Sequence, residues 1–120
     1  MERIKFIEYK GKKILYTDVS NANIEEAYKI IKEQQKIIFT FPENSLLTVA
    51  NFKNCEVTPK ATHDLKEIVL QNKPYVKATA VIGIGGIKRI MLNAVSKFSG
   101  RKFYVCDKLE DALEWLVNQE

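Results

Sequence analysis

The chain has 120 residues, of which 46% are hydrophobic and 28% are charged, and its formal net charge is +4. A chain of this length fits one domain, and the even mixture of residue types excludes a disordered or low-complexity protein. No apolar run approaches the ~20 residues of a membrane-spanning helix, and the first residues lack the apolar block of a signal peptide. We therefore expect one cytoplasmic domain over residues 1–120 that is not integral to a membrane.

The first predicted elements are the two strands of a β-hairpin. Ile4 to Tyr9 and Lys13 to Val19 are rich in β-forming residues. They flank residues 10–12, where Gly11 supplies the positive φ angle that a tight turn requires. The pattern predicts an antiparallel pair at the start of the chain.

A helix is predicted after this hairpin. Asn23 and Glu26 are spaced as a capping box. Its apolar face comprises Ile24, Ala27, Tyr28 and Ile31. Residues 36–41 either continue the helix or form a short extended piece, because the apolar pattern favours the first and the β-branched and aromatic residues favour the second. Pro42 ends either structure.

A buried strand and a second helix come next. Ser45 to Phe52 is a compact apolar run bounded by turn residues, which is typical of a strand buried on both faces. Thr58 is a good N-cap and Pro59 suits the first helical position, so we expect the helix to begin there. Pro74 follows its end, since the residue before proline is pushed out of the helical region. Its apolar face comprises Ala61, Leu65, Ile68 and Val69.

The remainder of the chain predicts a strand, a helix, a strand and a helix. Tyr75 to Ile84 and Lys102 to Cys106 are the strands, Gly100 caps the end of the first helix, and Asp107 caps the start of the second. The first helix has the clearest amphipathic pattern of the sequence. Its expected core face is Ile87, Ile90, Met91, Ala94, Val95 and Phe98. That of the final helix is Leu109, Ala112, Leu113, Leu116 and Val117.

The complete element order is therefore β-β-α-β-α-β-α-β-α. Strands that alternate with helices imply parallel strands joined by right-handed crossovers. We predict an α/β fold, with helices packed on a mostly parallel sheet that carries an N-terminal antiparallel hairpin. The segments around Leu46, Val81 and Val105 are expected to pair as neighbouring strands.

Four segments carry a resemblance to a known family. They are Ile14-Leu-Tyr-Thr-Asp-Val-Ser20, Asn72-Lys-Pro-Tyr-Val-Lys77, Asn93-Ala-Val-Ser-Lys-Phe-Ser-Gly-Arg101 and Glu110-Asp-Ala-Leu-Glu-Trp-Leu116. Together with the element order, they resemble the STAS-like proteins, small bacterial domains similar to anti-sigma-factor antagonists, and in particular the sporulation-antagonist-like branch. The resemblance covers essentially the whole chain. It implies a regulatory, protein-binding or ligand-binding role without enzyme activity.

The antagonists of this family carry a phosphorylatable serine at the start of the second helix, in an Asp-Ser-Ser-Gly-like turn. The matching region here is Asn54-Cys-Glu-Val-Thr-Pro59, which lacks that pattern. Thr58 is the only hydroxyl at the equivalent helix start, so the resemblance makes it the candidate phosphoacceptor. A phosphate there would meet free N–H groups and the positive end of the helix dipole. The alternative is that Thr58 serves only as the N-cap.

A second candidate site is the glycine turn before the third predicted helix. Backbone N–H groups of such a turn can bind an anion. Residues 68–106 contain no acidic side chain, which is typical of a surface for an anionic partner or of a solvated face. The dinucleotide fingerprint and the phosphate loop are both incomplete here, so simple turn formation is the alternative. The residues concerned are Gly83, Gly85, Gly86, Lys88 and Arg89.

The third candidate site is an apolar patch in the segment before Pro42. If its side chains were exposed, they would accept a lipid or a partner chain; burial in the core is the alternative. The members are Ile37, Ile38, Phe39 and Phe41. With this patch the domain would be a carrier of a small ligand, a lipid or a nucleotide, instead of a protein-binding module.

Catalytic and metal chemistry are not predicted. His63 has no nucleophile and orienting group at suitable spacing, and Cys55 and Cys106 are expected to be free thiols. No Cys/His cluster has zinc spacing, and we expect no cofactor. The aromatic residues do not interleave with basic ones, so nucleic-acid binding is not expected. We expect a monomer or a homodimer.

Overall fold

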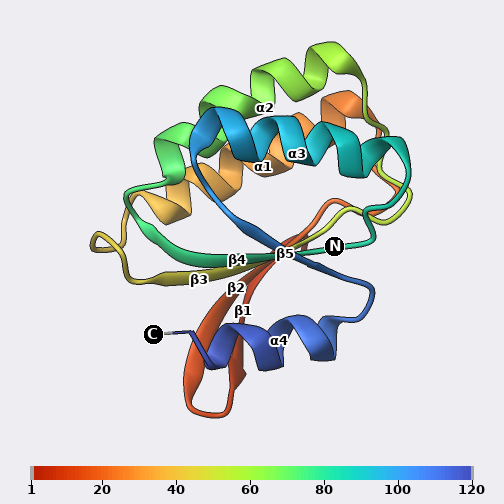
Figure 1. Cartoon of the computed structure of the whole chain (residues 1–120). Coiled ribbons are helices and arrows are strands. Elements are labelled where there is room, and N and C mark those ends of the chain that lie inside the picture. The colour runs from red at the N-terminus through yellow and green to blue at the C-terminus, as the bar shows by residue number, and fades with distance from the viewer. Residues whose placement is uncertain (1, 120) are drawn as a thin grey trace.

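The chain forms a five-stranded sheet whose spatial order follows the sequence, β1-β2-β3-β4-β5, in a computed structural model that describes residues 2–119 (Figure 1). β1 and β2 pair antiparallel, and each later strand pairs parallel to its predecessor. The elements are β1 (Ile4–Tyr9), β2 (Lys12–Asp18), α1 (Ile24–Ile38), β3 (Leu46–Asn51), α2 (Pro59–Asn72), β4 (Val76–Ile82), α3 (Ile87–Ser99), β5 (Phe103–Cys106) and α4 (Leu109–Val117). This confirms the predicted fold class and element order.

The register of the sheet confirms the predicted strand neighbours. Val81 lies opposite Ala50 of β3 and opposite Val105 of β5, and Leu46 lies opposite Val76. Because β2 to β5 are parallel, their carboxyl ends lie at one edge of the sheet. We call this the carboxyl edge; the four helices all begin after it.

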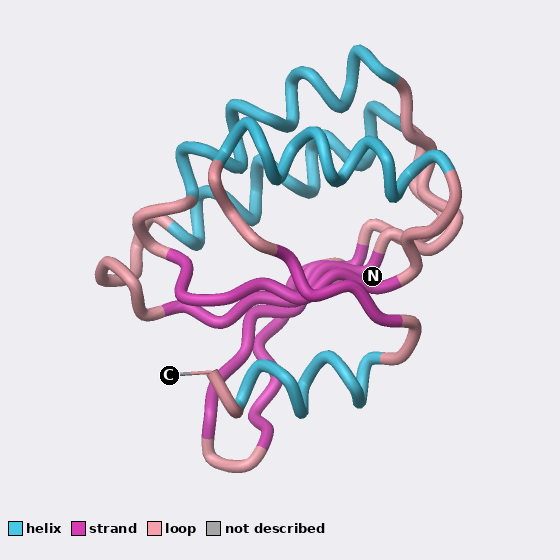
Figure 2. Tube along the Cα trace, in the orientation of Figure 1, coloured by secondary structure: helices cyan, strands magenta, loops and turns pink. Residues whose placement is uncertain are grey.

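The helices cover the two faces of the sheet unequally. α1, α2 and α3 form a layer on one face, and α4 lies alone on the other (Figures 1 and 2). The core under α4 joins its buried residues Ala112, Leu113 and Leu116 to sheet residues such as Val49 and Ala80. On the other face, smaller apolar clusters pack α1 against the sheet. Within residues 2–119, no helix has the length and apolar character needed to cross a bilayer.

Local signals set most helix ends. The Asn23 side chain accepts a hydrogen bond from the Glu26 N–H at 2.8 Å, and Gly100 ends α3 in the left-handed region with φ +72°. The ambiguous segment 36–41 is helical through Ile38 and then turns. The prediction for Asp107 was wrong: Lys108 occupies the N-cap of α4, without a side-chain capping bond.

The predicted core face of α3 is also wrong in part. Val95 is 1% exposed, whereas Ile87 and Ile90 are each 68% exposed and Phe98 is 47% exposed. α3 packs chiefly against α2, so it turns Val95 and Ser99 inward and leaves Ile87, Ile90 and Phe98 of the predicted stripe on the outside. The amphipathic pattern therefore marks the helix correctly but not the side that is buried.

Candidate functional site

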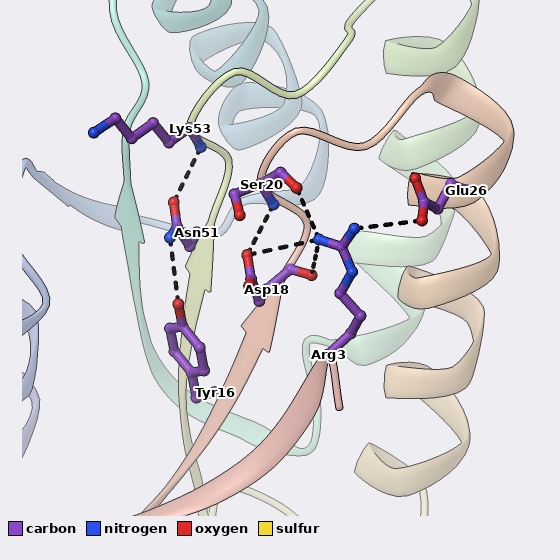
Figure 3. Close-up of polar contacts among 7 residues, drawn as sticks. All are labelled: Arg3, Tyr16, Asp18, Ser20, Glu26, Asn51 and Lys53. Atoms are coloured by element: carbon purple, nitrogen blue, oxygen red, sulfur yellow. Dashed lines mark hydrogen bonds and ion pairs between the residues drawn. The ribbon is translucent and has the colours of Figure 1, made fainter. Parts of the chain in front are cut away.

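A polar cluster holds the loops at the carboxyl edge (Figure 3). Arg3 donates from Nη1 to the Ser20 carbonyl at 2.7 Å and from Nη2 to the Glu26 carboxylate at 3.3 Å. The Ser20 N–H in turn donates to Asp18 Oδ1 at 2.9 Å. These contacts tie the segment before β1 to the β2–α1 loop and to the first turn of α1.

The loop after β3 is fixed in a similar way (Figure 3). The Asn51 side chain accepts from the Lys53 N–H at 3.0 Å and donates to the Tyr16 hydroxyl at 3.3 Å. The positions from which α1 and α2 begin are therefore determined by side-chain contacts, and these two helices border the main hollow of this edge.

An apolar groove of about 430 Å³ lies between α1 and α2; we call it the α1–α2 groove. Its apolar walls include Ile24, Tyr28, Ile31, Phe52, Leu65 and Ile68. Charged side chains of both signs also border it, namely Glu25, Lys29, Glu56, Lys60 and Asp64. The volume lies within the ~300–1,000 Å³ of small-molecule sites, which are mostly apolar with a few polar groups.

Thr58 borders this groove at the start of α2. Its Oγ1 accepts a hydrogen bond from the Ala61 N–H at 3.2 Å, which confirms the predicted N-cap. The hydroxyl is thus engaged with the helix end, and the residue is only partly exposed.

The glycine turn lies beside the loop that follows β3. Lys88 of α3 donates from Nζ to the Phe52 carbonyl at 3.5 Å, while Arg89 is exposed. Gly83 packs against Lys53, and Gly86 occupies the N-cap of α3 with φ +57°. The turn therefore supports the loop that forms one wall of the α1–α2 groove.

The four residues of the predicted apolar patch do not form one surface. Ile38 is 2% exposed and packs with Leu15 and Leu46. Phe39 lies against Tyr75, with ring centroids 5.2 Å apart, and Phe41 and Phe6 form a pair on another part of the surface. For Ile38 the alternative of core burial holds, because α1 continues through this residue and points its side chain into the core, whereas Phe39 is 47% exposed. Ile37 is partly buried beside Ile38.

Two side chains that can take part in acid–base or nucleophilic chemistry, Cys55 and His63, come from the segments that form the groove. Burial raises the pKa of the Cys55 thiol, which disfavours the reactive thiolate. His63 is exposed on α2. In the part of the chain that the structure describes, no three His, Cys, Asp or Glu side chains gather as a metal site.

A smaller inner cavity of about 70 Å³ lies under the helices and was not predicted. Ile31, Phe52, Leu65 and Ile68 border both this cavity and the α1–α2 groove. Its polar lining includes Thr17, Thr48, Thr79 and Arg101. The sequence does place a threonine in each of three strand segments. Threonine is also an ordinary β-forming residue, so these three residues did not by themselves indicate a polar cavity.

Comparison with known proteins bears on the fold. No family model matches the chain. An uncharacterized protein of the DUF3478 family from Shewanella loihica PV-4, which has a SpoIIAA-like fold, superimposes with a TM-score of 0.71. The match covers 94% of this chain and 91% of that chain, at 16% sequence identity. The chain therefore has a SpoIIAA-like, STAS-like fold, as the sequence resemblance implied.

A sequence match concerns a much larger protein. A cysteine–tRNA ligase from Lactobacillus helveticus (strain DPC 4571) is 36% identical over 73 residues. These residues cover 54% of this chain but 15% of the ligase.

Proposed function

We propose that this SpoIIAA-like domain is a non-enzymatic binding module whose α1–α2 groove takes an apolar small molecule. The observation that carries the proposal is the groove itself, a hollow of about 430 Å³ with apolar walls from two helices and the β3–α2 loop. Transfer of alkyl groups into such a site contributes about 0.8 kcal/mol for each buried CH₂. The raised pKa of Cys55 and the exposed position of His63 support binding over catalysis.

The border of the groove supports a ligand that is apolar over most of its length. Lys29 and Lys60 lie on the border together with Glu25, Glu56 and Asp64, so both signs of charge are present and no cationic group is left in excess to select an anion. Selectivity for a polar end group must come from elsewhere in the protein. A carrier of a small ligand was also considered from the sequence, but with its site in the segment before Pro42 and not between α1 and α2.

The test is to fill the groove without disturbing the core. Ala61 borders the groove on α2 and is partly exposed, so Ala61→Trp should occupy the hollow. Ala94→Trp places the same side chain at an exposed position of α3 and is the matched control. We expect the neutral dye Nile red to bind the unmodified protein and the control with blue-shifted emission, and to bind Ala61→Trp at least tenfold more weakly. Equal binding by all three proteins would rule out the groove as the site.

The exposed stripe of α3 favours a second function, the docking of an acidic protein partner. Ile87, Ile90 and Phe98 are exposed at helical spacing, next to the exposed cations Arg89 and Lys97. No acidic residue occurs from 68 to 106, so this face complements a negatively charged surface.

Site-specific photo-crosslinking tests this second function. A photoreactive residue at the exposed position Asn93 of α3 should capture one stoichiometric acidic partner in cells, and high salt should reduce the yield. Ile87→Ser with Ile90→Ser should abolish capture, whereas Phe39→Ser, which removes an exposed apolar side chain outside α3, should not. Loss of capture in the Phe39 variant as well would contradict docking at α3.

A further inference from the structure

A row of buried hydroxyl groups crosses the sheet under α1, α2 and α3. Thr48 and Thr79 lie opposite each other on β3 and β4, and their hydroxyl oxygens are 2.8 Å apart. Thr17 of β2 lies opposite Ala50, two residues further along β3 than Thr48. It is 1% exposed, and its Oγ1 has no hydrogen-bond partner among residues 2–119. A buried hydroxyl without a partner costs free energy, so this side chain is set up to receive one.

Arg101 stands at the β5 end of this row, just before the strand begins. Its guanidinium donates to the Val69 carbonyl at 3.4 Å and to the Thr79 hydroxyl, and it lies over the Phe103 ring at 5.1 Å. A guanidinium has five N–H donors, so most of its donor capacity is unused by these contacts. Among residues 2–119 it forms an ion pair with no carboxylate.

The charge of Arg101 is retained although the side chain is largely enclosed. Burial lowers its pKa to about 10, which leaves the guanidinium cationic at neutral pH. A cation removed from water without a counter-charge is costly. An anion placed beside it would gain both the charge interaction and two parallel hydrogen bonds.

The space available is the inner cavity. It has a volume of about 70 Å³ and is bordered by Thr17, Thr48, Thr79 and Arg101. This is enough for a carboxylate, the smallest of the common anionic lipid headgroups. The α1–α2 groove shares a wall with it, made of Ile31, Phe52, Leu65 and Ile68. An alkyl chain that reaches from one space to the other requires these side chains to move apart.

We propose that the inner cavity binds the carboxylate of an amphipathic acid whose alkyl chain occupies the α1–α2 groove. Arg101 neutralises the carboxylate, and the hydroxyls of Thr17 and Thr48 donate to its oxygens. The inference rests on the proposed function, because it needs the groove to hold the alkyl chain. It adds the ligand class, a monocarboxylic acid such as a fatty acid, and the residues that select it.

The experiment compares three ligands with one alkyl chain, dodecanoate, dodecyl phosphate and 1-dodecanol, by isothermal titration calorimetry. We expect the unmodified protein to bind dodecanoate at least tenfold more tightly than either of the others. Arg101→Met should abolish the preference over dodecanol while dodecanol affinity is kept, and the nearly isosteric Thr17→Val should weaken dodecanoate binding severalfold. Lys102→Met removes an exposed cation one residue away and should change nothing.

The outcomes separate the two proposals. Equal affinity for dodecanoate and dodecanol, or a preference that survives in Arg101→Met, overturns the carboxylate site and leaves the groove as an apolar site. Tighter binding of dodecyl phosphate overturns the assignment to carboxylates. Failure of all three ligands and of Nile red overturns the groove as well. Thr17→Val removes only one hydroxyl and should fold. If Arg101→Met does not fold, unchanged dodecanoate affinity in Thr17→Val would still overturn the carboxylate site.

Discussion

Gly83, after the end of β4, packs directly against the backbone of Lys53 in the loop after β3. A Cβ atom on Gly83 would lie 2.8 Å from the Lys53 Cα and from its N, and the residue has φ +81°. A Cβ atom on Gly85 or on Gly86 would meet no other atom within 4 Å. Of the three glycines predicted as an anion site, Gly83 therefore has a packing role, which keeps two loops of the carboxyl edge in contact.

Replacement of Gly83 should separate this packing role from a role in binding. Gly83→Ala combines a steric overlap with an unfavourable φ angle, so we expect a loss of about 2–4 kcal/mol in the free energy of unfolding. Gly85→Ala meets no atom within 4 Å and should change stability by less than ~0.5 kcal/mol. Urea denaturation followed by circular dichroism measures both. Similar values for the two variants would contradict the tight contact.

The N-cap of α2 should be sensitive to the chemistry of residue 58. Thr58→Ala removes the acceptor for the Ala61 N–H and should lower the free energy of unfolding by about 1 kcal/mol, whereas Thr58→Ser should be nearly neutral. Thr58→Asp keeps an acceptor and adds a negative charge at the positive end of the helix dipole, so it should be at least as stable. Urea denaturation followed by circular dichroism measures the free energy of unfolding of all three variants. A destabilised Thr58→Asp would show that this helix end does not tolerate the charge that phosphorylation would bring.

The face of α3 that contacts the rest of the molecule should be revealed by two sets of variants. Val95→Ala removes buried methyl groups and should cost about 2 kcal/mol. Ile87→Ser and Ile90→Ser change exposed positions and should each cost less than ~1 kcal/mol, chiefly through helix propensity. The reverse order in thermal or urea denaturation would place Ile87 and Ile90 in the core, as the sequence predicted.

The ion cluster of Glu114 should make stability depend on pH. Glu114 accepts from the Tyr9 hydroxyl at 3.0 Å and from the Lys10 ammonium. The hydrogen bonds from Lys10 and Tyr9 lower the pKa of the Glu114 carboxyl, so its contribution is present above the unfolded-state pKa of ~4.3 and is lost as the pH falls through the folded-state value. The same bonds raise the pKa of Lys10 and of Tyr9, so their contribution is lost as the pH rises through those raised values.

Glu114→Gln tests this cluster. At pH 7 the variant should be less stable than the unmodified protein, and the difference should disappear once the pH falls below the lowered folded-state pKa of Glu114, where both side chains are uncharged. Glu43→Gln alters an exposed carboxylate that forms no ion pair among the described residues, and it serves as the control. A difference between Glu114→Gln and the unmodified protein that does not vary with pH would exclude an electrostatic cause.

Elements that depend on local chemistry were predictable from the sequence. Asn23 and Thr58 cap α1 and α2 because their side chains accept from an N–H three residues on, and Gly100 ends α3 because it adopts a positive φ angle. The alternation of strands and helices was sufficient to predict parallel neighbours. These signals lie within a few residues of the structure they determine, so no tertiary information was needed.

The sites depended on contacts that the sequence does not specify. Hydrophobic periodicity shows that α3 has an apolar stripe, but only its packing on α2 leaves Ile87 and Ile90 exposed. The α1–α2 groove is lined by residues of both helices and of the β3–α2 loop, which come together only in the folded chain. Thr17 and Arg101, far apart in the sequence, border one cavity because their strands belong to the same sheet. Local sequence determined the elements of this protein; the distances between elements, which only the folded chain sets, determined where a ligand can enter.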